Sequence, residues 1–351
     1  MKNVLLTTTA LVAFAGAAAA EMSFSGSTDI GYNDEINGGL FADTEFNLNG
    51  SVDLGDGFAA TFTYGFDVDT SDDTDSGLLW DEYPTIEITS PFGSLKGGDL
   101  DDKGASEYFY ADRDGMALDV ENSDTSDRFD LRALVEFGDF GLAVGGVDDG
   151  AGDLDGLSVG AGATFGNFTL GFGYDEADGG LESRDALDVP NGNTNEVMAV
   201  SLDTTFGDAS IGLSYIDDSV ETSVGVAVGY DVSADLSLGA YYASNEVAAN
   251  GDAYGVWASY AMGALGVEAY YDATEDGPDE IYLDVSYEIM AGLTGYAGVY
   301  DDGMAADPFF YIGGVYEIND NLSATVSYAD ADEISGPEFK NGTTVMLTAS
   351  F

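Results

Sequence analysis

The chain has 351 residues, of which 8 are Lys or Arg and 66 are Asp or Glu, so its formal charge is −58. This balance disfavours a nucleic-acid partner, because phosphate binding needs clustered cations. The chain has no Cys and no His, which excludes disulfides, thiolate and histidine metal sites, and the Ser-His and Cys-His catalytic arrangements. We expect a protein that is not an enzyme and needs no cofactor.

Strong acidity alone would suit a disordered chain, but disordered chains contain few aromatic and β-branched residues. Here 45% of the residues are hydrophobic, and the chain contains 21 Tyr and 20 Phe. The composition therefore predicts a folded protein.

The first twenty residues have the features of an export signal. Lys2 provides a positive start, residues 4–18 are apolar apart from three threonines, and Ala18-Ala19-Ala20 precedes Glu21 as a cleavage site would. A membrane anchor is the alternative, but the apolar stretch is short for a spanning helix of about 20 residues. We predict a cleaved signal peptide over 1–20 and one domain over 21–351. No later stretch is apolar for long enough to span a membrane as a helix, so a membrane form of the chain would be a closed β-barrel.

Apolar and polar residues alternate along much of the chain, which is the period of a β-strand. The sequence IYLDVSYEI at 281–289 is an example, and 43–54, 128–137 and 344–351 alternate in the same way. No segment shows a sustained apolar stripe at helical spacing. The fold class predicted from the residues is all-β and antiparallel.

Two kinds of connection separate these segments. Nine are short turns, at 55–57, 90–93, 138–139, 166–167, 207–208, 233–235, 262–263, 290–292 and 319–321. Mostly longer, Asp-rich segments lie between them, at 34–42, 69–78, 99–127, 148–155, 175–195, 217–221, 245–252, 272–279, 301–308 and 330–340. Short turns on one rim and long loops on the other are typical of an outer-membrane barrel. Nine hairpins with one further strand at each end give a direct count of up to 20 strands.

A barrel of this size leaves a lumen too wide for side chains to fill, so the polar face should line water and the apolar face should meet lipid. Aromatic residues near the strand ends would form the interfacial girdles: Tyr32, Phe66, Trp80, Phe137, Phe165, Phe168, Tyr174, Phe206, Tyr230 and Tyr328. A large soluble β-sandwich or β-solenoid surface protein is the alternative.

Three stretches of the chain resemble the general outer-membrane porins of alphaproteobacteria. They are the opening strand Met22-Ser23-Phe24-Ser25-Gly26, the TFGNFTLGFGY stretch at 164–174, and the end VMLTASF at 345–351. The resemblance implies a transmembrane barrel of 16 strands in the outer membrane of a Gram-negative bacterium. It also implies a homotrimer, passage of small hydrophilic solutes and ions, and a third long loop folded into the lumen. Terminal Phe351 is similar to the signal that the membrane-insertion machinery reads.

The longest loop, 99–127, is the third on the long-loop side, and we predict that it forms the pore constriction. Its acidic candidates are Asp99, Asp101, Asp102, Glu107, Asp112, Asp114, Asp119 and Glu121. The basic candidates on or beside it are Lys96, Lys103, Arg113, Arg128 and Arg132. These charges could create a transverse field that sets selectivity. Alternatively, the cations pin an otherwise repulsive acidic loop to the wall.

The early strands place Asp43, Glu45 and Asp53 on the predicted lumen wall, where related pores often carry arginines. We therefore predict a preference for cations. A saline habitat would also explain the acidic excess, since acidic surfaces keep proteins soluble.

Calcium is a second possible ligand. Asp72, Asp73 and Asp75 could supply hard oxygen ligands for a structural Ca²⁺, although the segment fails the EF-hand pattern because Asp72 stands where glycine is needed. The alternative function is accordingly a secreted, acidic, Ca²⁺-binding surface or adhesion protein.

Overall fold

The computed structural model describes residues 21–36, 38–69, 77–80, 84–98, 100, 105–106, 108–116, 118, 130–148, 154–176, 195–246, 251–275, 277–305, 307–331 and 339–351. The predicted signal peptide and the candidate calcium ligands Asp72, Asp73 and Asp75 lie outside these residues. The described chain contains no helix that is long and apolar enough to cross a membrane.

The described residues form 21 strand segments and no helix. Their bounds are β1 Glu21–Asn33, β2 Leu40–Gly55, β3 Phe58–Asp69, β4 Gly77–Trp80, β5 Thr85–Ser90, β6 Gly93–Gly98, β7 Asp130–Phe137, β8 Phe140–Asp148, β9 Leu154–Phe165, β10 Phe168–Asp175, β11 Val197–Phe206, β12 Ala209–Asp217, β13 Thr222–Ser233, β14 Leu236–Asn245, β15 Ala253–Met262, β16 Leu265–Thr274, β17 Glu280–Met290, β18 Leu293–Asp301, β19 Phe309–Asn319, β20 Leu322–Ala329 and β21 Gly342–Ser350.

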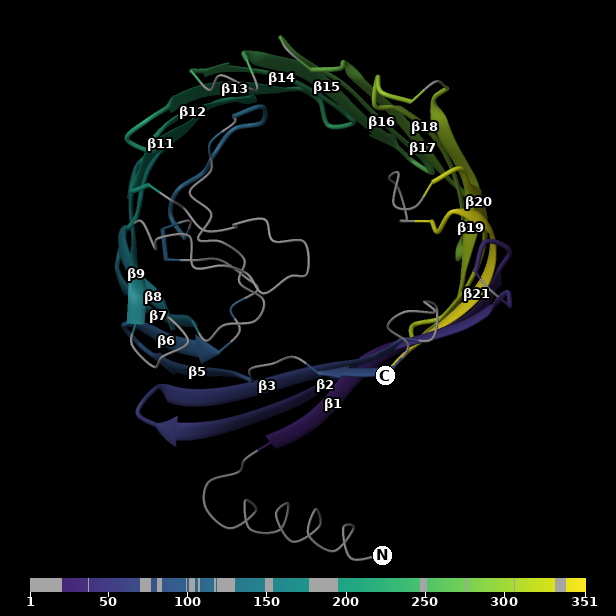
Figure 1. Cartoon of the computed structure of the whole chain (residues 1–351), viewed down its shortest axis with the longest axis horizontal. Coiled ribbons are helices and arrows are strands. Elements are labelled where there is room, and N and C mark those ends of the chain that lie inside the picture. Colours follow the sequence, from purple (N-terminus) through teal and green to yellow (C-terminus); the bar gives the residue numbers. More distant parts are fainter. Residues whose placement is uncertain are drawn as a thin grey trace, which may run out of the picture.

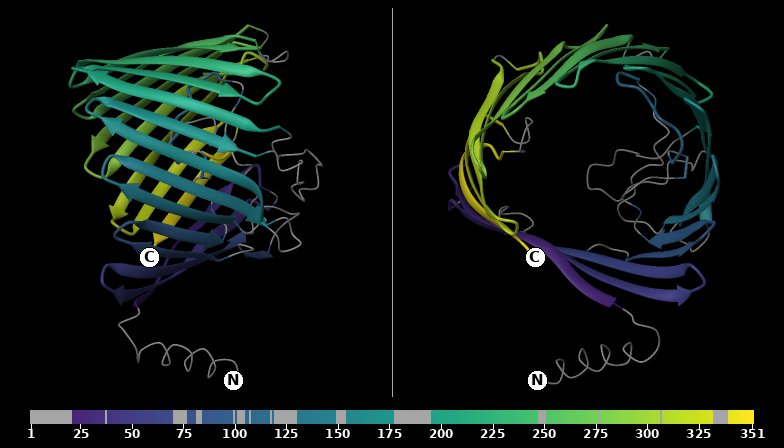
Figure 2. Two further views of the ribbon diagram at one scale, coloured as in Figure 1. Left: turned by 90° about the vertical axis from the view of Figure 1, so that its left-hand side faces the viewer. Right: turned by 180° about the vertical axis from the view of Figure 1, so that it is seen from behind.

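Each strand pairs antiparallel with its neighbours, and the ring closes because β1 also pairs with β21, from Ser27 opposite Ser350 to Asn33 opposite Thr344. Figure 1 looks into this ring, and Figure 2 shows the tilt of the strands. Segments β4 and β5 both pair with β3, at its two ends, so they occupy one position. In the described chain the ring thus has 20 positions. The direct hairpin count is confirmed, and the 16 strands implied by the family resemblance are wrong, because each predicted short turn joins a separate pair of strands.

The short turns form where the sequence predicts them, and glycine supplies the backbone geometry of several. Gly138, Gly166, Gly207 and Gly263 each begin a two-residue turn with φ of 59°, 64°, 61° and 63°. A positive φ at the first central residue suits a type II′ hairpin turn, whose twist matches the strands.

The two faces of the wall differ as the alternation predicts. Large apolar side chains are exposed on the outside, such as Val200 at 43%, Leu213 at 44% and Leu283 at 45%. The inner face holds small polar residues such as Ser201 and Ser214, which are buried because Ala111 of the third loop lies against them. Outward side chains exposed at a strand end include Phe137, Phe165 and Phe206. This arrangement suits a lipid-facing exterior with an aromatic girdle.

The chain terminus completes the barrel seam. The N–H of Phe351 donates to the carbonyl of Gly26, whose own N–H donates back, each over 3.1 Å. The exposed ring of Phe351 lies 5.9 Å from that of Phe46 on the outer face. The last residue is therefore on the lipid-facing side, as its phase predicts.

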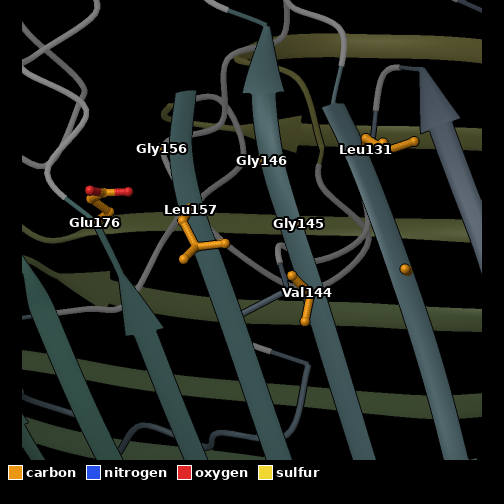
Figure 3. A pocket seen from close by; sticks show the side chains of 8 residues that line it. Leu131, Val144, Gly145, Gly146, Gly156, Leu157 and Glu176 are labelled. Carbon is orange, nitrogen blue, oxygen red and sulfur yellow. The ribbon is translucent and has the colours of Figure 1, made fainter. Parts of the chain in front are cut away.

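A shallow apolar hollow lies where the β8–β9 pairing shifts register between Gly145 and Val147. Leu131, Val144 and Leu157 line it (Figure 3), and they belong to the outward phase, opposite to buried Arg132 and Ser158. This hollow therefore faces outward, away from the space inside the ring.

Candidate functional site: the third loop against the inner wall

The described parts of the third loop lie inside the ring, as predicted from its length and the family resemblance. In Figure 1 these segments, drawn in blue, follow the inner side of the wall near β9 and β11–β13. Two apolar clusters attach them to the wall. Ala105 packs with Leu134 and Ala143, and Tyr110 packs with Val197, Ala199 and Ile216. Both clusters are small, so polar contacts and shape complete the attachment.

Glycines on the inner face leave room for the loop. An ideal Cβ at Gly160 would lie 2.0 Å from the carbonyl oxygen of Ala105, and one at Gly171 would lie 2.1 Å from that of Phe109. Gly162 accommodates the ring of Phe109 in the same way. A side chain at either of the first two positions would collide with loop backbone, so these glycines set how closely the loop approaches.

Hydroxyls on the same face bind the loop backbone. The N–H of Ser106 donates to Ser158 Oγ over 2.8 Å, and its own hydroxyl donates to Asp175 Oδ2 over 2.6 Å. Ala111 is held on both sides, because its N–H donates to Ser201 Oγ over 3.1 Å and its carbonyl accepts from Ser214 Oγ over 2.5 Å. These bonds fix Ser106 and Ala111, which belong to the docked residues 105–106 and 108–111.

The turn at 113–116 also contacts the wall, and Met116 and Leu118 pack against the cluster around Tyr110. Asn245 Nδ2 donates to the carbonyl of Gly115 over 2.9 Å. Arg113 lies over Gly212 and forms a 2.7 Å ion pair with Asp203, with side-chain exposures of 11% and 44%. The guanidinium is therefore turned into the wall rather than toward the lumen.

Arg132 is also withdrawn from solvent. It is 4% exposed on the inner face of β7, and its guanidinium carbon lies 5.0 Å from the ring centroid of Tyr108, which belongs to the loop. Lys96 is opposite Arg132 in the β6–β7 pairing and Glu87 is opposite Lys96, which places all three on one face. A cation over an aromatic ring stabilises the contact between loop and wall.

The acidic side chains are placed differently. Asp112 and Asp114 are exposed on the loop, and Glu45 and Asp53 are exposed on β2, where Asp43 is half-buried. The remaining constriction candidates lie outside the described residues: Asp99, Asp101, Asp102, Lys103, Glu107, Asp119, Glu121 and Arg128. Among the described charged residues of the loop, the exposed ones are thus acidic, and Lys96 on the wall beside Arg132 is half-buried.

Sequence reasoning did not identify Asp203, the serines or the docking glycines as parts of this site. Their partners are in the loop, so alternation assigns them to the inner face but cannot show what covers them.

In the described part of the chain, no group of three Asp or Glu residues is arranged to hold a metal ion.

A model described as Gram-negative porin matches residues 7–123, 104–243 and 182–336, which together cover most of the sequence. The chain belongs to the Gram-negative porin family. A porin of Rhodobacter capsulatus is 25% identical over 315 residues, which are 81% of this chain and 95% of that protein.

Among solved structures, a triple mutant of Rhodopseudomonas blastica porin is 12% identical, with a TM-score of 0.47, over 94% of this chain and 100% of that chain. The family places this porin in the outer membrane as a channel that passes solutes. This finding sets aside the secreted adhesion protein.

Proposed function

We propose that this porin is a water-filled channel for passive diffusion of small hydrophilic solutes and ions, that it prefers cations, and that it needs neither a catalytic residue nor a cofactor. The carrying observation is the unequal placement of charge at the docked loop. Arg113 is neutralised by Asp203 and Arg132 is buried under Tyr108, while Asp112 and Asp114 remain exposed. In a narrow passage, exposed carboxylates attract cations and repel anions.

In this proposal the two arginines pin the loop, and the acidic residues supply the selectivity. The inner wall supports the same reading, because residues 185–339 contain no Lys or Arg at all. Strands β11 to β20 therefore contribute no fixed positive charge to the lumen.

The test is the reversal potential of the purified porin in a planar bilayer with a KCl gradient. We expect a sign that favours K⁺, and a smaller potential for the variant D112N/D114N. The matched control is Asp320→Asn, which removes a carboxylate from the short turn between β19 and β20. A sign that favours Cl⁻ would refute the cation preference, and an absence of stepwise conductance would refute the channel.

Three finer points belong to the same proposal. We propose cleavage of the signal peptide before Glu21, which N-terminal sequencing of the mature protein would test. We also propose assembly as a homotrimer, tested by the mass of the detergent-solubilised protein. Ca²⁺ at Asp72, Asp73 and Asp75 would be a structural ion that conduction does not require, and calorimetry with and without a chelator would test whether it binds.

A further inference from the structure

The inner wall beyond the docked loop carries a row of aromatic side chains, which we call the aromatic row. Register pairs join its members across five strands, each opposite the next: Trp257 on β15, Tyr270 on β16, Tyr282 on β17, Tyr300 on β18 and Phe309 on β19. All five belong to the phase opposite to the exposed outer residues Val256 and Ile281. The row therefore presents aromatic side chains to the lumen on five neighbouring strands.

The rings lie near one another along the row. Tyr270 and Tyr282 are stacked with centroids 4.9 Å apart, and Tyr300 and Phe309 are stacked at 6.5 Å. Trp257 is 38% exposed and lies against Gly239, which leaves it room to lie along the wall. Trp257, Tyr270 and Tyr300 are less buried than Tyr282, so they are the members that a solute in the lumen can reach.

Carboxylates flank the aromatic row on both sides. Asp272 and Glu280 are opposite each other two residues away on one side, and Glu268 and Asp284 are opposite each other on the other side. No Lys or Arg occurs between residues 185 and 339, so no cation of these strands neutralises them. The row is therefore an aromatic surface in a negative field.

Asp284 is the most buried of these carboxylates. The residue is 8% exposed, and its Oδ2 has no hydrogen-bond partner among the described residues. Its register partner Gly298 is covered by the ring of Tyr311, whose hydroxyl is buried without a partner too. A buried carboxylate with no opposite charge beside it is costly, and a cationic group of a solute held near it would offset that charge, which a neutral solute cannot do.

The aromatic row starts where the third loop docks. Gly115 of the loop lies against the ring of Tyr241 on β14, and Tyr241 and Asp272 both lie over Gly255, between β14 and β16. A solute that has passed the loop therefore meets the row next, on the neighbouring part of the wall.

We propose that the aromatic row and its flanking carboxylates form a weak binding track for organic cations, meaning ammonium groups with apolar substituents. The rings would bind the cation through their faces and the carboxylates would supply the opposite charge. This proposal rests on the channel function proposed above, and it adds the class of solute that the channel retains.

The experiment is the block of KCl current through single porin channels by tetraethylammonium, with maltotriose as a neutral probe. We expect saturable block by tetraethylammonium. The variants W257L, Y270L and Y300L keep apolar volume but remove the ring face, so each should weaken the block about two- to fivefold. D284N should weaken it as well. Matched controls are Y254L, on the outer face of β15, and E317Q, on the inner face of β19 away from the row.

Native-like KCl conductance in each variant shows that the barrel has folded, so a change in block then reports on the row. Block that does not saturate, or that the ring variants leave unchanged, would overturn the proposal while the channel function stands. If maltotriose blocked the current saturably and D284N did not alter that block, the row would be a sugar site. That result would also overturn the proposal of a track for organic cations. A chain that conducts no KCl would overturn the channel function itself.

Discussion

The close approach of the third loop to the wall makes Gly160 a sensitive position. Its φ is ordinary for a strand, so an alanine there meets no backbone strain, only the carbonyl of Ala105 at 2.0 Å. To reach an ordinary contact of about 3.5 Å the loop must retreat by roughly 1.5 Å. That movement breaks the two hydrogen bonds of Ser106, to Ser158 and to Asp175.

The size of the effect follows from these bonds. A neutral hydrogen bond stabilises by about 1 kcal/mol and one to a charged group by about 1.5–3 kcal/mol, so G160A should cost about 2.5–4 kcal/mol of docking free energy. This shifts the docking equilibrium by roughly a hundredfold or more. The undocked loop would leave the wall, and the narrowing that it forms would lose its fixed shape.

Single-channel recording of G160A should show a changed mean conductance and increased current noise, and trypsin should cut after Arg113 faster than in the native porin. Gly50→Ala is the control, because the nearest atom to an added Cβ there is Phe62 Cβ at an ordinary 3.9 Å. If G160A retained native conductance, noise and trypsin resistance, the loop would not be held by this contact and our account of its docking would be refuted.

Three further outcomes are expected. R113Q removes the 2.7 Å ion pair with Asp203 and leaves that carboxylate unpaired. We therefore expect a noisier current and a stronger preference for cations, measured by the reversal potential. An unchanged or weaker preference would contradict the role of Arg113 in pinning the loop. In the loop after β18, backbone N–H groups of Ala305 and Met304 lower the pKa of Asp302 below its ordinary 3.8, so the turn is stabilised above that pH and loosens as pH falls through the lowered pKa. Amide exchange at Met304 and Ala305 should show this acid dependence, and D302N should abolish it. F351S should reduce the amount of folded porin in the outer membrane, counted by membrane fractionation, with S350A as a control that should not.

The strands and turns could be predicted because their causes are local. Alternation fixes the face of each residue, as for Leu283 and Asp284, and a glycine at the start of a two-residue turn fixes a hairpin, as for Gly138. Strand number followed from counting such turns. The 16 strands borrowed from the resemblance were wrong, since resemblance in a few stretches does not fix the number of hairpins.

The docked loop could be predicted only in outline. Its length and acidity pointed to the lumen, but its contacts join residues far apart in the chain, such as Ala111 with Ser201 and Arg113 with Asp203. Nothing in the sequence around Gly160 shows that the backbone of Ala105, from the loop, lies against it. The aromatic row was hidden for the same reason, because Trp257 and Tyr270 become adjacent only through strand pairing.

The alternation of apolar and polar residues, which places one face of each strand toward lipid and the other toward water, also affects the chain before the barrel closes. In an unfolded chain, segments that alternate apolar with polar residues, such as 43–54, expose no long apolar run, and the like charges of the acidic residues repel neighbouring chains. Crowded precursors of this protein should therefore stay apart in solution while they await insertion. After insertion the same carboxylates line the water-filled lumen. One chemical group therefore first keeps the precursor chains apart and later keeps the channel hydrated.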